Sequence, residues 1–169
     1  MMGTGKTAVG RALAKRLKRP FYDTDRLIEE RERRSIPAIF ESNGESYFRD
    51  LEAAVVRESA AKPAGVIATG GGALLREENR AALKRQGVLV WLKTDIETML
   101  NRTKGRSTRP LLNVKDRRAQ VERLLTERTP VYAAADLSVE TTGKSVEEAV
   151  RMILNRIEGG EMERQQEAR

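Results

Sequence analysis

The sequence contains no cysteine and no histidine. This excludes disulfides, thiolate or imidazole metal ligands, and mechanisms that use a cysteine nucleophile or a histidine base. Aromatic residues make up only 4% of the 169 positions, so few side chains are available for stacking on nucleic-acid bases. Acid–base chemistry must therefore come from Asp, Glu, Lys or Tyr.

Long apolar runs are also absent. The longest, residues 88–92, reads VLVWL, whereas about 20 apolar residues are needed to span a bilayer. The N-terminus lacks the apolar segment of a signal peptide, so we expect a cytoplasmic protein with no membrane partner. The length predicts one domain over 1–158, and we expect the polar tail, 159–169, to be disordered.

Positive charge is what the sequence has in excess. Its 32 Lys and Arg against 25 Asp and Glu give a formal net charge of +7, which favours phosphate, carboxylate or nucleic acid as a partner. Only charge supports nucleic acid, and its clearest local feature is a basic cluster at 11–19. With so few aromatic residues, a solvated helix face explains that cluster better, and we expect no nucleic-acid partner.

Helical patterns alternate with short apolar strands along the chain. We predict helices near 7–18, in two stretches within 25–60, and near 77–86. Further helices are predicted to begin near 95, to end near 128–130 and to span about 145–157. Short strands are predicted at 21–22, 66–69, 88–92 and 137–140. This order predicts an α/β fold with three layers, in which helices cover both faces of a central parallel sheet. Ligands of such sheets lie beyond the carboxyl ends of the strands.

Residues 3–7, GTGKT, open the first predicted helix and match the end of a Walker A loop. The backbone N–H groups of such a loop face phosphates at a helix N-terminus. The match predicts that ATP phosphates bind at six consecutive residues: Gly3, Thr4, Gly5, Lys6, Thr7 and Ala8. Lys6 would reach the β- and γ-phosphates as a catalytic residue, and the Thr7 hydroxyl would ligate Mg²⁺.

The Walker A pattern is incomplete, because its first glycine would lie one residue before Met1 and the strand that precedes such a loop is missing. Each apolar side chain of that strand would contribute about 1.5–3 kcal/mol, against a total stability of about 5–15 kcal/mol. We therefore expect the natural start to lie about 8–12 residues upstream.

Five further motifs follow in order: DTD at 23–25, FRxxE at 48–52, GGG at 70–72, RPLL at 109–112 and RTPVY at 128–132. Together with the phosphate loop they resemble the shikimate kinase family over about 1–157. The resemblance implies ATP-dependent phosphorylation of the shikimate 3-hydroxyl, giving shikimate 3-phosphate and ADP, in aromatic amino-acid synthesis. It also implies a monomer whose partners are two small molecules, ATP and shikimate.

The resemblance assigns roles around the shikimate ring. Asp25 would hold the attacking hydroxyl as catalytic base or positioning group, Arg49 and Arg128 would bind the carboxylate, and Gly71 with Gly72 would contact the ring. Arg49 would be oriented by Glu52. These residues would come from a helical substrate-binding segment, 25–60, and from the loops around it.

Further roles concern the nucleotide. Asp23 would hold Mg²⁺ through water, near Thr7. Arg102 and Lys144 would lie at the adenine. Arg109 would be catalytic and would close over the phosphates from a mobile lid at 103–115.

Simpler interpretations of the same residues remain open. Asp23 and Asp25 could serve as a helix N-cap and a turn residue. Residues 70–72 could form only a flexible turn, and Arg49 could simply form an ion pair with Glu45 or Glu52. Two other functions remain open as well: a small P-loop kinase of another hydroxylated substrate such as gluconate or a nucleoside monophosphate, and a nucleotide-binding homologue without catalysis.

Overall fold

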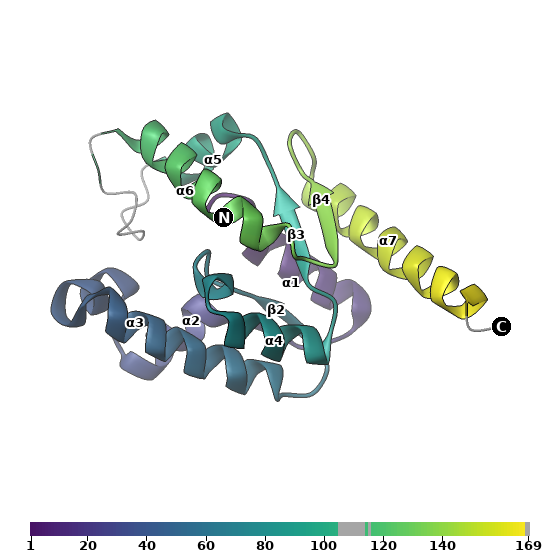
Figure 1. Ribbon diagram of the computed structural model, residues 1–169, viewed down its shortest axis with the longest axis horizontal. Helices are drawn as coiled ribbons and strands as arrows, with labels where there is room; N and C mark the ends of the chain where they lie inside the picture. Colours follow the sequence, from purple (N-terminus) through teal and green to yellow (C-terminus); the bar gives the residue numbers. More distant parts are fainter. Residues whose placement is uncertain (105–113, 115, 168–169) are drawn as a thin grey trace.

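The computed structural model describes residues 1–104, 114 and 116–167 (Figure 1). The helices are α1 (Lys6–Leu17), α2 (Thr24–Glu32), α3 (Ile36–Ala60), α4 (Glu77–Gln86), α5 (Ile96–Thr103), α6 (Arg117–Tyr132) and α7 (Val146–Glu167), with a 3₁₀ turn η1 (Ala73–Leu75). The strands are β1 (Phe21–Asp23), β2 (Val66–Ala68), β3 (Val90–Lys93) and β4 (Leu137–Glu140). The predicted α/β alternation is confirmed.

Helix ends lie where short polar side chains cap them. The Asp23 carboxylate accepts hydrogen bonds from the N–H groups of Asp25 and Arg26 at the start of α2, and Ser35 and Asp95 cap α3 and α5 in the same way. Gly44, at φ 79° and ψ 175°, kinks α3 where the sequence predicted a break.

The start of β3 and the end of α6 each lie two residues beyond the predicted position. β3 begins at Val90, because the Leu89 N–H donates to the Asp136 carboxylate at 2.8 Å instead of to a strand. α6 continues past Pro130, where the buried Tyr132 packs one turn after Arg128 and holds the last turn.

The tail prediction also needs correction, because α7 continues to Glu167 and takes in most of the segment expected to be disordered, 159–169. Glu, Met, Arg and Gln favour helix, and together they outweigh the two glycines at 159 and 160, which cost about 1 kcal/mol each.

The sheet is parallel, as predicted, but it consists of two separate pairs of strands. β1 pairs with β2, with Phe21 opposite Val66. β3 pairs with β4, with Val90 opposite Leu137. Among the described residues β2 and β3 have no strand between them and do not pair with each other.

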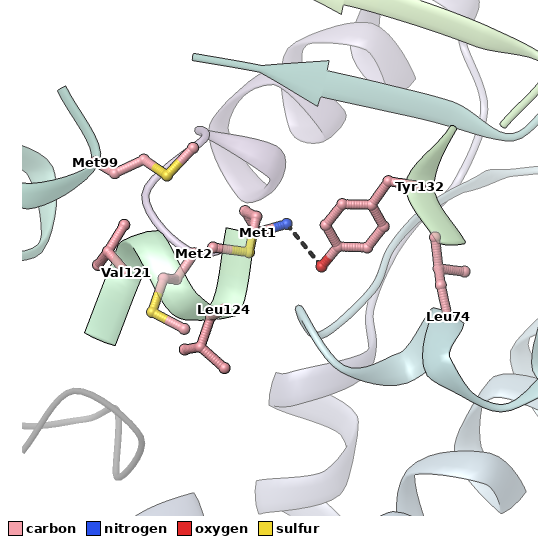
Figure 2. Packing of buried hydrophobic residues seen from close by; sticks show 7 residues of the cluster. All are labelled: Met1, Met2, Leu74, Met99, Val121, Leu124 and Tyr132. Carbon is pink, nitrogen blue, oxygen red and sulfur yellow. Dashed lines mark hydrogen bonds between the residues drawn. The ribbon is translucent and has the colours of Figure 1, made fainter. Parts of the chain in front are cut away.

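The core has an apolar cluster on each side of β3. Leu92 packs with α1 and α7, in a cluster that includes Val9 and Ile153. Trp91 points the other way and packs against a cluster from the N-terminus, η1, α5 and α6 (Figure 2), made of Met1, Met2, Leu74, Met99, Val121, Leu124 and Tyr132. Because successive strand residues point to opposite faces, this gives the expected three layers.

A third cluster holds the helical segment together. Ile28 of α2 and Ile39, Phe48 and Val55 of α3 are buried against one another. Within the described part of the chain, no helix combines the length and apolar character needed to cross a membrane.

Replacing a helical glycine by alanine is expected to have opposite effects on stability at Gly10 and at Gly159. At Gly10 a Cβ atom would lie 2.8 Å from the Phe21 ring, so Gly10→Ala should lower the free energy of unfolding by about 1–3 kcal/mol. At Gly159 nothing lies within 4 Å, so Gly159→Ala should raise it by about 0.5–1 kcal/mol. Urea unfolding of both variants tests this, and equal shifts would contradict the close helix–strand contact.

Candidate active site

The phosphate loop turns tightly into the N-terminus of α1. Gly3 and Gly5 have φ of 72° and 86°, which favours glycine, and a side chain on Gly3 would also meet the Met99 carbonyl at 2.9 Å. The Lys6 ammonium donates to the Met1 carbonyl, and the buried Thr4 hydroxyl donates to the same oxygen at 3.1 Å. These contacts curl the loop around the helix N-terminus, which attracts anions.

The two predicted magnesium ligands lie side by side. The Thr7 hydroxyl donates to an Asp23 carboxylate oxygen at 2.8 Å, joining the start of α1 to the end of β1. In the described part of the chain, no group of three or more acidic side chains is placed to hold a metal ion. The oxygens of Thr7 and Asp23 still suit Mg²⁺, which at phosphate sites takes one or two protein ligands and fills its other positions with phosphate and water.

A cavity of about 660 Å³ brings together most of the residues predicted for ATP. Gly3, Thr4, Gly5, Lys6, Thr7, Ala8, Asp23, Asp25, Arg102 and Lys144 all line it. Arg102 of α5 donates to the Gly3 carbonyl at 3.4 Å. Lys144 lies just before α7 and forms an ion pair with Glu148 at 3.9 Å. Arg109 lies outside the described residues, as does most of the predicted lid.

A second group of predicted residues meets at the glycine loop that follows β2. A Cβ atom on Gly70 would lie 2.5 Å from Glu52 Oε1 and 2.7 Å from Asp25 Oδ1, and one on Gly72 would collide with the Arg49 guanidinium. The Arg128 guanidinium donates to the Gly71 carbonyl at 3.0 Å. The three glycines therefore lie against the charged ends of these side chains, and a side chain at Gly70 or Gly72 would displace them.

Glu52 holds Arg49 in place, as predicted. Glu52 is buried and accepts from Arg49 at 2.7 Å, while the more exposed Glu45 accepts from the same guanidinium at 2.8 Å. Burial raises the pKa of the Glu52 carboxyl, an effect that Arg49 only partly offsets and that the nearby charge of Asp25 adds to. Its second oxygen, Oε1, has no hydrogen-bond partner among the described residues.

Two residues that support the glycine loop were not identified from the sequence. The Thr24 hydroxyl accepts from the Gly70 N–H at 3.1 Å. The Tyr132 hydroxyl donates to the Gly71 carbonyl at 2.5 Å, beside the bond from Arg128. For Tyr132, the available signal was its spacing of four residues from Arg128, which places both side chains on one helix face. For Thr24, the signal was its position within the DTD motif.

Asp25 connects the two regions. It lines the phosphate-loop cavity, and it also approaches Gly70 beside Glu52. The Asp25 carboxylate therefore lies between the phosphate-loop cavity and the two guanidinium groups at the glycine loop. The fold and the phosphate loop together define an α/β protein of the P-loop class.

Comparison with known proteins agrees with this class. The model of the shikimate kinase family matches residues 2–158. The chain is 47% identical to the shikimate kinase of Ruegeria pomeroyi over 155 residues, which cover 91% of this chain and 80% of that protein. It is 46% identical to the enzyme of Symbiobacterium thermophilum, covering 94% of this chain and 92% of the relative.

Solved structures give the same result. Shikimate kinase from Acinetobacter baumannii in complex with shikimate superposes with a TM-score of 0.92 at 41% identity, covering 94% of this chain and 89% of that one. The Aquifex aeolicus enzyme gives 0.81 at 36% identity, covering 96% and 94%. The chain belongs to the shikimate kinase family.

The buried Glu52 carboxyl predicts a pH-dependent stability. Its pKa is higher in the folded chain than the ordinary value of 4.5, so the folded state binds the proton more tightly. As pH increases from about 4.5, the chain should therefore lose stability relative to Glu52→Gln, by up to about 1.4 kcal/mol per pH unit until Glu52 is ionised.

Urea unfolding of both proteins from pH 4 to 8 measures this difference. The matched control is Glu127→Gln, which changes an exposed glutamate of α6 that pairs with Arg123 at 3.7 Å. Its stability difference from the parent chain should change little with pH. Parallel stability curves for the chain and Glu52→Gln would contradict the raised pKa.

Proposed function

We propose that the chain transfers the γ-phosphoryl group of ATP to the 3-hydroxyl of shikimate, giving shikimate 3-phosphate and ADP. The observation that carries this proposal is the position of Asp25 between the phosphate-loop cavity and the paired arginines. In the transfer, a bond forms between the hydroxyl oxygen and the γ-phosphorus while the bond to the β–γ bridging oxygen breaks. Asp25 accepts the hydroxyl proton or orients the hydroxyl for attack.

Arg49 and Arg128 are proposed to bind the shikimate carboxylate. Two guanidinium groups suit a planar carboxylate, because each donates paired hydrogen bonds that a lysine does not reproduce. Support comes from their approach to adjacent glycines: Arg49 contacts Gly72, and Arg128 Nη1 lies 3.3 Å from the Cβ position of Gly71. We assign Gly71 and Gly72 to the ring, with a Gly71 N–H bond to a hydroxyl.

For the nucleotide, we assign the phosphates to residues 3–8. Lys6 neutralises charge that develops on the transferred group, while Arg102 and Lys144 border the adenine. Mg²⁺ would be held by Thr7 and, through water, by Asp23; when bound it neutralises charge on the phosphates. Arg109 is assigned to the phosphates on the RPLL motif alone. Since all these residues belong to one chain, we propose a monomer, with no role in nucleic-acid binding.

The direct test is ADP release by the chain with ATP and Mg²⁺, measured with and without shikimate. Shikimate-dependent release supports the proposal. Dependence on gluconate or a nucleoside monophosphate would assign another small kinase, and nucleotide binding without turnover would indicate a non-catalytic homologue.

Asp25→Asn should lower shikimate-dependent turnover by at least about 100-fold, because the amide no longer accepts the hydroxyl proton. The KM for ATP should change little, since Lys6 and the loop N–H groups are retained. Steady-state kinetics with circular dichroism as a folding check tests this. Full turnover in the variant would show that Asp25 is not part of the reaction.

Arg49→Lys should raise the KM for shikimate by about 10–100-fold, because a paired, charge-assisted contact is lost. A smaller change is expected in kcat and in the KM for ATP. The control is Arg16→Lys on the exposed face of α1, which should alter none of these constants. An unchanged KM for shikimate in Arg49→Lys would remove Arg49 from the carboxylate site.

Arg109→Ala should lower kcat much more than shikimate affinity, because its proposed contact is with the phosphates and not with shikimate. Shikimate affinity can be measured by calorimetry and kcat by ADP release. Equal turnover in the variant would refute the assignment.

A further inference from the structure

The glycine loop is held from the side of α6 by two residues that lie one helical turn apart. The Tyr132 hydroxyl donates to the Gly71 carbonyl at 2.5 Å, and Arg128 Nη1 donates to the same oxygen at 3.0 Å. A carbonyl oxygen has two lone pairs, so these two bonds use its full capacity as an acceptor. Of the two donors, Arg128 is also the one that is proposed to bind the substrate carboxylate.

The position of the Tyr132 hydroxyl and the direction of its proton are both fixed. Tyr132 is 3% exposed, and the centroid of its ring lies 5.7 Å from that of Trp91. The Met1 nitrogen donates to the hydroxyl at 3.0 Å (Figure 2), which leaves the hydroxyl proton for the Gly71 carbonyl. Burial raises the pKa of the Tyr132 hydroxyl, so the hydroxyl keeps this proton at neutral pH.

The Gly71 carbonyl belongs to the same peptide group as the Gly72 N–H. In a planar trans peptide these two groups point to opposite sides, and none of the described peptide bonds is cis. Anchoring the carbonyl to α6 therefore turns the Gly72 N–H away from α6. In the described part of the chain, no acceptor is bonded to the N–H groups of Gly71 and Gly72, so both can donate to the hydroxyl groups of a ligand.

Arg128 has hydrogen-bonding capacity that the folded chain does not use. The residue is 4% exposed, and its Nε has no partner among the described residues. An unpaired donor on a buried charged group is costly, whereas a bound carboxylate accepts from a guanidinium through both of its oxygens. When Arg128 turns toward such a carboxylate, its bond to the Gly71 carbonyl weakens, and the bond from Tyr132 remains.

We propose that Tyr132 is a positioning residue of the shikimate site, whose hydroxyl holds the Gly71–Gly72 peptide in place while Arg128 binds the substrate carboxylate. This inference rests on the proposed function. Tyr132 acts through Gly71 and does not touch the substrate. It bonds to Gly71 and to Met1, neither of which is assigned to ATP, so its effect belongs to shikimate binding.

The test compares two variants that each remove one tyrosine hydroxyl. Tyr132→Phe deletes the bond to the Gly71 carbonyl and keeps the ring against Trp91. The matched control is Tyr47→Phe, which deletes a bond from an exposed hydroxyl of α3 to Glu32 at 3.1 Å. ADP release gives kcat and the KM for each substrate, and calorimetry gives the Kd of shikimate without ATP.

In Tyr132→Phe the KM and the Kd for shikimate should both increase by about 5–20-fold. The kcat and the KM for ATP should change by no more than about twofold, because uniform binding of one substrate is what is lost. Tyr47→Phe should alter none of these constants. A merely structural role would lower the amount of active protein, and so the apparent kcat, without changing either KM. Equal shikimate constants in the two variants would overturn the inference.

Labelling the glycines with ¹⁵N adds a readout that needs no substrate. Loss of the bond to the Gly71 carbonyl should move the Gly72 amide signal in Tyr132→Phe and not in Tyr47→Phe, since the carbonyl and that N–H share one peptide group. A Gly72 signal that stays in place would also overturn the inference.

These outcomes are separable from a failure of the proposed function. A parent chain that does not bind shikimate would overturn the proposed function, and the role of Tyr132 with it. A parent chain that binds shikimate no more tightly than Tyr132→Phe does would overturn the role of Tyr132 alone.

Discussion

Close packing of charged side chains against residues 70–72 is the constraint on which the site depends. Glu52 and Asp25 come within 2.5 and 2.7 Å of where a Gly70 side chain would begin, and Arg49 occupies the space beside Gly72. A Cβ atom at Gly70 or Gly72 would displace the charged ends of these three side chains. Because residues 70–72 have no side chains, their backbone fits between the helical segment and the phosphate loop. Asp25 can then approach both the glycine loop and the phosphate-loop cavity.

Motifs built from neighbouring residues could be read from the sequence. The bounds of α4 and β4 were predicted residue for residue, because an amphipathic helix and a short apolar strand each carry their own pattern. The family resemblance implied that Asp23 lies near Thr7, and the two side chains are in contact. A strand end and a loop at a helix N-terminus meet in this way at one edge of a parallel sheet.

Features that depend on contacts between distant residues could not be predicted from the sequence. The division of the sheet depends on which strand edges find partners, and no local pattern records that. Tyr132 supports Gly71 across 61 positions of sequence, and Thr24 supports Gly70 across 46. Both contacts join a side chain to the backbone of a distant loop, and nothing in the local sequence says which backbone group such a hydroxyl will contact. The C-terminal end of α7 was missed because polarity was taken to mean disorder, although an exposed helix is polar too.

If the glycine loop binds a substrate carboxylate as proposed, the charges around it would connect protonation of Glu52 to that binding. Arg49 and Arg128 carry two positive charges, and Asp25 and Glu52 carry two negative ones when both are ionised, so these four groups then have no net charge. With Glu52 protonated the same four groups carry one positive charge, which a carboxylate neutralises. Burial already raises the pKa of Glu52, and a carboxylate bound to Arg49 would raise it further by competing for the same guanidinium. By linkage, a proton on Glu52 and a carboxylate on Arg49 favour each other's binding.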